Sequence, residues 1–144
     1  MKKEKKGRKK GNNLNIKEPQ TKKSVSKKDV ESFDYPIFCF KHLSDRSYKD
    51  CTKPKFFIDY LKRLQKLSEL GWEEIRKSDK HQFGIEKLPV KMIKPDLPSI
   101  VTPDVTKVDV FRANGDNHPF VGLVNGNVFQ VFFIESRFGD VYDH

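Results

Sequence analysis

The alternation of apolar and polar side chains predicts strands at both ends of the region from residue 32 onward. Residues 33–43, "FDYPIFCFKHL", place apolar side chains on both faces of an extended segment, which predicts a covered strand with Pro36 at its start or edge. In the last third, "VTKVDVFRAN", "HPFVGLV" and "NVFQVFFIE" alternate and predict three further strands. Asn125-Gly126 predicts a hairpin between the last two, and the segment Asn114–Asn117 predicts the turn before them.

Between these strands, apolar side chains recur at spacings of three and four, which predicts a helix. The recurring positions are Phe57, Tyr60, Leu61, Leu64, Leu67 and Leu70. Thr52 is suited to cap this helix, and Pro54 is tolerated in a first turn. Gly71 fits a helix C-terminal position, and residues 72–77 predict a short second helix. The two helices form either a helical hairpin or one bent helix.

The remaining segments predict a connector and a short closing strand. Residues 78–104 contain four prolines and predict a connector, with an edge strand around Val90–Ile93. The ending "DVYDH", residues 140–144, predicts a short fourth strand after the meander. This element order predicts an α+β fold, in which a helical hairpin packs on an antiparallel sheet made of the C-terminal meander and an N-terminal strand.

Charge divides the chain into two parts. Residues 1–31 carry 12 Lys and Arg against 4 Asp and Glu, a net charge of +8, whereas residues 32–144 carry a net charge of only +1. The first part has no aromatic residue, so it predicts a disordered lysine-rich tail before a single domain at 32–144. Such a charge block is typical of an arm that binds nucleic acid without reading sequence, and the alternative is a solubilising tail. The basic positions nearest the start are Lys2, Lys3, Lys5, Lys6, Arg8, Lys9 and Lys10.

The sequence lacks the patterns that are typical of several classes of protein and site. No run of about 18 apolar residues predicts a membrane span, and the basic start is not followed by the apolar stretch of a secretory signal, so we expect a cytoplasmic protein. Cys39 and Cys51 fit neither a zinc site nor a disulfide framework. There is no glycine-rich phosphate loop and no hydrolase or metalloprotease motif, so we expect no cofactor. Residues 140–144 hold two aspartates and a histidine, but their spacing is not that of a usual metal site, and we predict none.

Two segments resemble the RelE/ParE-like toxin superfamily. These are "VFRANGDNHPFVGLVNGNVFQVFFIE", with Arg112 in its first strand, and "DVYDH", with Tyr142 and His144. The resemblance covers residues 34–144 at the level of element order, and it implies a helical hairpin on an antiparallel sheet. Several members of the superfamily cleave ribosome-bound messenger RNA without a metal, and others act on gyrase. The segments "FCFKHL" and "YDH" also resemble uncharacterised proteins of phages and mobile elements.

The side chains required for metal-independent RNA cleavage are present. The reaction needs a base for the 2′-hydroxyl, cations for the phosphate and an acid for the leaving oxygen. We predict Arg112, Tyr142 and His144 as catalytic residues. Lys41, His42 and Arg137 are predicted substrate-binding residues.

Several of these assignments have a structural alternative. Arg112 can instead pair with Asp109 or Glu135, Tyr142 can pack with Val141 in a strand, and His144 can fray into solvent. His42 can be a core histidine. His81 and His118 lie beside turn signals, and we expect both to be exposed to solvent.

The sequence therefore supports two functional hypotheses. The first is a toxin-type protein that acts on RNA, as a metal-independent endonuclease associated with ribosomes and controlled by a cognate antitoxin. The second is a non-catalytic module, such as a phage or mobile-element accessory protein, that binds a protein partner while its basic tail holds nucleic acid.

Overall fold

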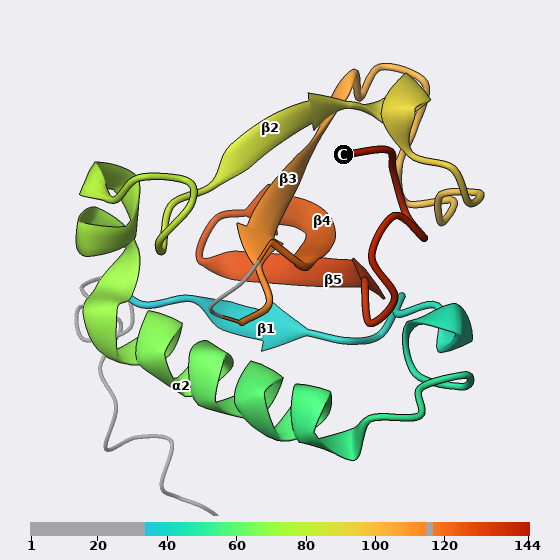
Figure 1. Cartoon of the computed structure of the whole chain (residues 1–144). Helices are drawn as coiled ribbons and strands as arrows, with labels where there is room; N and C mark the ends of the chain where they lie inside the picture. The colour runs from blue at the N-terminus through green and yellow to red at the C-terminus, as the bar shows by residue number, and fades with distance from the viewer. Residues whose placement is uncertain (1–33, 115–116) are drawn as a thin grey trace, which may run out of the picture. The chain divides into compact units, whose positions relative to one another are not determined.

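A five-stranded mixed sheet packs against one long helix, which confirms the predicted α+β class (Figure 1). The computed structural model describes residues 34–114 and 117–144, which belong to one unit, Asp34–His144. The predicted disordered tail at residues 1–31 and part of the predicted turn at 114–117 lie outside the described residues. Within the described part of the chain, no helix combines the length and the apolar character that crossing a membrane requires.

The strands follow the predicted meander, but the N-terminal strand runs in an unexpected direction. Their bounds are β1 (Ile37–Cys39), β2 (Glu86–Pro89), β3 (Lys107–Arg112), β4 (Pro119–Asn125) and β5 (Val128–Ile134), in the spatial order β1-β5-β4-β3-β2. β3, β4 and β5 are antiparallel neighbours, as predicted. β1 pairs with β5 in parallel, so the prediction of a fully antiparallel sheet is wrong in this detail. Residue alternation shows which face a side chain occupies, whereas strand direction depends on how the chain crosses over between strands.

Two further strand predictions, one in the connector and one at the C-terminus, are wrong. The edge strand ends at Pro89, and Val90–Met92 form the 3-10 turn η3, because the Ile93 N–H donates to the Val90 carbonyl at 3.1 Å. The segment after residue 135 is not a strand, although it is fixed in place. The Lys94 N–H donates to the Val141 carbonyl at 2.7 Å, which joins this segment to the connector.

The helix is bent at Gly71, which decides between the two predicted arrangements in favour of a bent helix. Helix α2 (Pro54–Lys77) is interrupted at Gly71, where φ is 81° and ψ is 165°. Asp34 holds the second segment, because its carbonyl accepts the Trp72 N–H at 2.9 Å and its carboxylate accepts the Glu73 N–H at 3.1 Å. Lys53, and not Thr52, precedes the first turn, and no side chain caps it.

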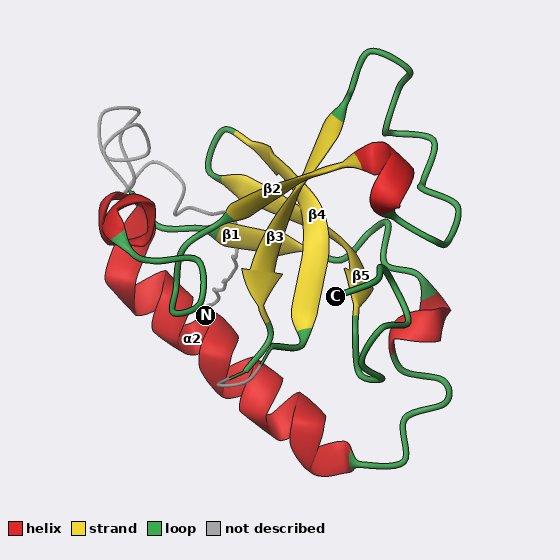
Figure 2. Cartoon of the chain, turned by 45° about the horizontal axis from the view of Figure 1, so that its top comes forward, coloured by secondary structure: helices red, strands yellow, loops and turns green. Residues whose placement is uncertain are grey.

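Both faces of the sheet are covered by other parts of the chain (Figure 2), and the packing on each face is apolar. On one face α2 contributes buried side chains that meet three phenylalanines of the strands, which are in ring contact with one another. The members of this core include Tyr60, Leu67, Trp72, Ile75, Phe111, Phe120 and Phe129. On the other face, the connector and the C-terminal segment cover a second core that includes Leu88, Ile93, Val108, Val110, Val121, Phe133, Val141 and Tyr142. The apolar alternation of the meander is therefore explained by two cores, one on each side.

The hairpin between β4 and β5 forms one residue later than the sequence signal indicates. Asn125 and Val128 pair across a two-residue turn, and Gly126 has a φ of 64°. The irregularity at Val121 and Gly122 lies in the same pair of strands. A Cβ atom on Gly122 would overlap the backbone of Gln130, so the close approach of β4 and β5 requires a glycine there.

Candidate functional site

Glu135, directly after β5, fixes the C-terminal segment against the sheet. Its side chain is fully buried, and its Oε1 lies 2.6 Å from Nε2 of His144. Its Oε2 accepts the backbone N–H of Val141 at 2.7 Å. The His144 side chain is only 16% exposed, so the end of the chain is ordered and the alternative of a frayed histidine is wrong.

Arg112 and Tyr142, two predicted catalytic residues, are in contact and buried. Nη1 of Arg112 donates to the Tyr142 hydroxyl at 3.3 Å, and its Nη2 forms an ion pair with Oε1 of Glu86 at 3.1 Å. The two side chains are 7% and 5% exposed. Burial raises the pKa of Tyr142, and the hydrogen bond and charge of Arg112 offset part of this effect.

The partners that the structural alternative gave to Arg112 are occupied by other groups. Asp109 accepts hydrogen bonds from Lys87 and from the Val124 N–H. Glu135 is occupied by His144 and Val141. The pairing with Asp109 or Glu135 is therefore wrong, and Glu86 on the neighbouring strand β2 takes that place.

A continuous row of rings connects these residues to α2. Tyr142 and His144 have ring centroids 4.3 Å apart, and His144 stacks on Phe138 at 4.0 Å with 23° between the planes. Phe138 meets the ring of His118 edge-on at 5.5 Å, and His118 meets Phe56 of α2 at 5.4 Å. The structure thus brings the predicted catalytic residues together and adds further rings to them.

His118 is held by the same residue as His144. Its Nδ1 lies 2.8 Å from the backbone carbonyl oxygen of Glu135. A carbonyl oxygen only accepts, so Nδ1 carries the proton and the lone pair of the neutral ring is at Nε2. His118 is half-buried, which corrects the expectation of an exposed side chain, whereas His81 is exposed as predicted.

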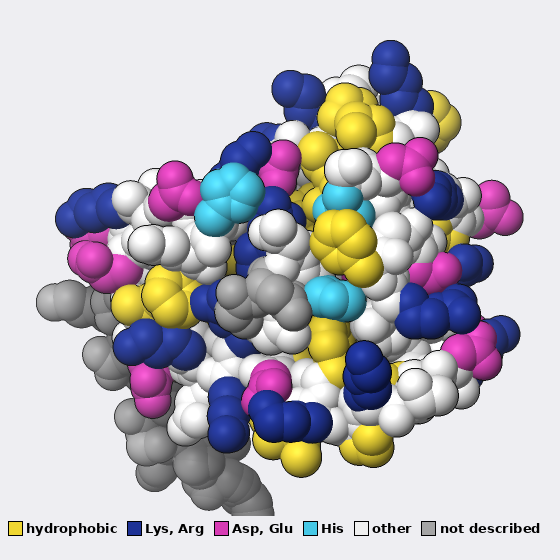
Figure 3. All heavy atoms as spheres, in the orientation of Figure 1, with side chains coloured by type: hydrophobic (Ala, Val, Ile, Leu, Met, Phe, Trp, Pro, Cys, Tyr) yellow, Lys and Arg dark blue, Asp and Glu magenta, His cyan; other side chains and the backbone are white. Residues whose placement is uncertain are grey.

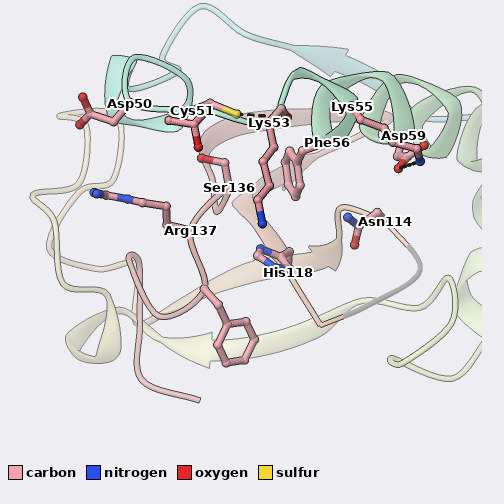
Figure 4. A pocket seen from close by; sticks show the side chains of 12 residues that line it. Asp50, Cys51, Lys53, Lys55, Phe56, Asp59, Asn114, His118, Ser136 and Arg137 are labelled. Atoms are coloured by element: carbon pink, nitrogen blue, oxygen red, sulfur yellow. Dashed lines mark hydrogen bonds and ion pairs between the residues drawn. The ribbon is translucent and has the colours of Figure 1, made fainter.

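A pocket of about 560 Å³ lies between the start of α2 and this row of rings (Figure 4). Figure 4 shows Lys53 extending from the start of the helix toward His118, with Phe56 beside it. The pocket is lined by Asp50, Cys51, Thr52, Lys53, Lys55, Phe56, Asp59, Asn114, His118, Ser136, Arg137 and Phe138. It combines basic and aromatic side chains, which is the composition that suits a phosphorylated aromatic ligand.

The predicted substrate-binding residues are divided between two places. Arg137 lines the pocket and pairs with Asp140 at 3.4 Å. Lys41 and His42 lie in the turn after β1, at the sheet edge opposite β2, and neither lines this pocket. The structure therefore brings Arg137 to the site but does not bring Lys41 and His42 there.

The surface around the site is mixed in charge. Figure 3 shows histidine and hydrophobic side chains side by side in the middle of this face, with basic side chains near them. Across residues 34–114 and 117–144, no three histidine, cysteine, aspartate or glutamate side chains are grouped so as to hold a metal ion. The acidic residues near the end have basic partners, since Asp140 pairs with Arg46 and Arg137, and Asp143 with Lys94.

Sequence reasoning missed the roles of Glu135, Glu86, His118 and Phe138. One signal was available, because Glu135 ends the apolar run "VFFIE", and a charged residue that continues a buried strand needs a partner. His118 and Phe138 gave no such signal, since each acquires its role only when β4 and the C-terminal segment come together.

Comparisons of the chain with protein-family models, curated proteins and solved structures gave no significant match. The resemblance to the RelE/ParE-like superfamily therefore stays a prediction.

Proposed function

We propose that the protein acts on RNA as a metal-independent endoribonuclease of the RelE/ParE-like toxin type, in the cytoplasm and in association with ribosomes. The observation that carries the proposal is the placement of two histidines on one residue. His118 and His144 are both hydrogen-bonded to Glu135, and both contact the exposed ring of Phe138. A histidine pair supplies both the base and the acid that RNA cleavage needs.

The two histidines take opposite roles in the proposed reaction. The 2′-oxygen attacks the adjacent phosphorus and the bond to the 5′-oxygen of the next nucleotide breaks, which leaves a 2′,3′-cyclic phosphate and a 5′-hydroxyl. Nε2 of neutral His118 takes the proton of the 2′-hydroxyl, because its Nδ1–H is donated to Glu135. Protonated His144 gives its Nδ1 proton to the leaving 5′-oxygen, because its Nε2–H is held on the Glu135 carboxylate.

Arg112 and Tyr142 act through His144 in this proposal. Both are too buried to contact an RNA phosphate directly. Arg112 fixes the Tyr142 hydroxyl, and the Tyr142 ring packs against the imidazole of His144. They are positioning residues, so their loss is expected to misplace the acid rather than to remove it.

The test is cleavage of a labelled messenger RNA, free and on ribosomes, by the full chain in excess EDTA. His118→Asn and His144→Gln each keep an amide donor for Glu135 and remove the titrating ring. We expect each variant to lower the cleavage rate by about 10²- to 10⁴-fold, the usual contribution of a general acid or base. His81→Asn, a matched change at an exposed histidine, is expected to leave the rate unchanged.

Product analysis and a folding control make this test decisive. Circular dichroism and thermal unfolding establish that each variant is folded, and the wild-type product is expected to carry a 2′,3′-cyclic phosphate. The absence of cleavage by folded wild-type protein on both substrates would overturn the proposal. Full activity in both histidine variants would do the same.

One observation favours the second candidate, a non-catalytic module that binds an antitoxin or another protein while the basic tail holds nucleic acid. Ile58 and Leu61 lie about one turn apart on the outer surface of α2 and are 56% and 67% exposed. Neighbouring exposed apolar side chains on a helix are typical of a helix that meets a partner. If folded wild-type protein has no nuclease activity, the non-catalytic module becomes the favoured function.

A further inference from the structure

The pocket beside the candidate site has the size of a small-ligand site. Its volume of about 560 Å³ lies within the roughly 300–1,000 Å³ of typical ligand pockets. Its lining includes the start of α2, Phe138 and His118, so a ligand inside it would lie next to His118 (Figure 4). A base that is paired in a duplex cannot enter such a pocket, whereas an unpaired base can.

Lys53 is the cation that this pocket offers to a phosphate. The side chain is exposed, and its ammonium forms no ion pair with a described residue. Figure 4 shows it directed from the start of α2 toward His118. A phosphate between these two side chains would lie beside the imidazole that we propose as the base.

Most of the other charged groups of the lining have partners. Lys55 pairs with Asp59 at 2.9 Å, and Arg137 pairs with Asp140 at 3.4 Å. Asp50 contributes a negative charge to the same lining. The pocket therefore does not bind anions in general. Among its basic groups, Lys53 is the one whose removal should weaken phosphate binding most.

Phe138 provides the stacking surface. Its ring is 55% exposed, and His144 covers one face at a centroid distance of 4.0 Å. His118 meets the same ring edge-on at 5.5 Å, and the exposed remainder of the ring is the surface that a planar ligand can contact. Stacking of a base on such a ring tolerates every base, because each has a π-face.

We propose that this pocket is a subsite for one unpaired nucleotide next to the bond that is cleaved, with Lys53 on its phosphate and Phe138 against its base. The inference rests on the proposed function and deepens it, because it names the residues that select a single-stranded substrate. It assigns no base preference, since stacking on Phe138 and an ion pair between Lys53 and the phosphate are the same for every base.

The test is titration of the full chain with adenosine 5′-monophosphate, ribose 5-phosphate and inorganic phosphate at physiological salt, followed by NMR or calorimetry. The mononucleotide is expected to bind at least about fivefold more tightly than ribose 5-phosphate, because it adds base stacking. Lys53→Gln is expected to weaken both ligands about threefold or more. Phe138→Leu, which keeps an apolar contact for His144, is expected to weaken only the mononucleotide.

Lys66→Gln is the matched control, because Lys66 is exposed on α2 and does not line the pocket. Equal binding of the three ligands, or equal effects of Lys53→Gln and Lys66→Gln, would overturn the subsite. RNA cleavage by the same preparation separates the two proposals. Wild-type protein that cleaves RNA without preferring the mononucleotide refutes the subsite alone, whereas protein that binds it as expected and cleaves nothing refutes the nuclease alone.

Discussion

The imidazole of His144 closes on the buried carboxylate of Glu135, with 2.6 Å between Nε2 and Oε1. The carboxylate itself is completely shielded from solvent, and its second oxygen holds the Val141 N–H. A buried carboxylate that loses one of its partners is costly, because water cannot replace the lost group. This pair therefore connects the stability of the fold to the position of the proposed acid.

We expect His144→Ala to lower the free energy of unfolding by about 3 kcal/mol, because it leaves the Glu135 carboxylate with one hydrogen bond. His144→Gln keeps a donor for Oε1 and is expected to recover more than half of that loss. Urea denaturation measures both values. A loss below about 0.5 kcal/mol in His144→Ala would mean that the pair does not stabilise the fold.

Tyr60 and Tyr142 are expected to respond differently to loss of the hydroxyl. The Tyr60 hydroxyl is buried and has no hydrogen-bond partner among the described residues, so Tyr60→Phe is expected to be neutral or stabilising by up to about 1–2 kcal/mol. Tyr142→Phe removes the contact with Arg112 and is expected to cost about 1 kcal/mol. Chemical denaturation at neutral pH compares the two variants. A large loss of stability in Tyr60→Phe would mean that the Tyr60 hydroxyl has a hydrogen-bond partner.

Stability is expected to decline at alkaline pH. Burial raises the pKa of both Tyr60 and Tyr142, so the folded state keeps these protons at a pH where the unfolded chain releases them. The stabilisation is complete below the ordinary tyrosine pKa of about 10 and is lost as pH rises through the raised values. Thermal unfolding between neutral and strongly alkaline pH should show this decline, and Tyr60→Phe should make it shallower.

Gly71→Ala is expected to be more destabilising than the same change at Gly139. Both glycines have positive φ, 81° and 85°, a conformation that costs other residues about 1–3 kcal/mol. A Cβ on Gly71 would also lie 2.6 Å from the Asp34 carbonyl oxygen, whereas a Cβ on Gly139 meets nothing within 4 Å. Denaturant midpoints of the two variants give the comparison, and equal losses would show that the contact with Asp34 relaxes freely.

The basic tail is expected to control the salt dependence of RNA affinity. Replacing Lys2, Lys3, Lys5, Lys6, Arg8, Lys9 and Lys10 by glutamine removes seven cations from the chain. If each contacts one phosphate of single-stranded RNA, the slope of log affinity against log salt should become shallower by about 5. Titrations at several salt concentrations measure the slope, and an unchanged slope would favour the solubilising role of the tail.

The sequence predicted what depends on local pattern and missed what depends on distant packing. Gly71 was identified as a helix end because its neighbours set the helical period on both sides. Arg112, Tyr142 and His144 were grouped by residue type and by resemblance, and the fold brings them together. The direction of β1 was wrong, because alternation defines faces and carries no information on direction.

The site itself was only half predictable. Arg137 lines the pocket, whereas Lys41 and His42 do not. The position of Lys41 and His42 depends on which edge of the sheet β1 occupies, and the sequence does not indicate that edge. Glu135 organises both histidines from the end of a strand whose sequence reads as apolar core. Its role requires that β4 and the C-terminal segment approach it from different directions.

The parallel pairing of β1 with β5 has a consequence for synthesis of the protein. β1 is made early, but its partner Val128–Ile134 leaves the ribosome only after the rest of the sheet has been translated. Until then one edge of β4 is also unpaired, and the residues that hold His118 have not yet arrived. The nascent chain therefore completes its sheet and its proposed site in one late step, and a product truncated after β4 should have neither.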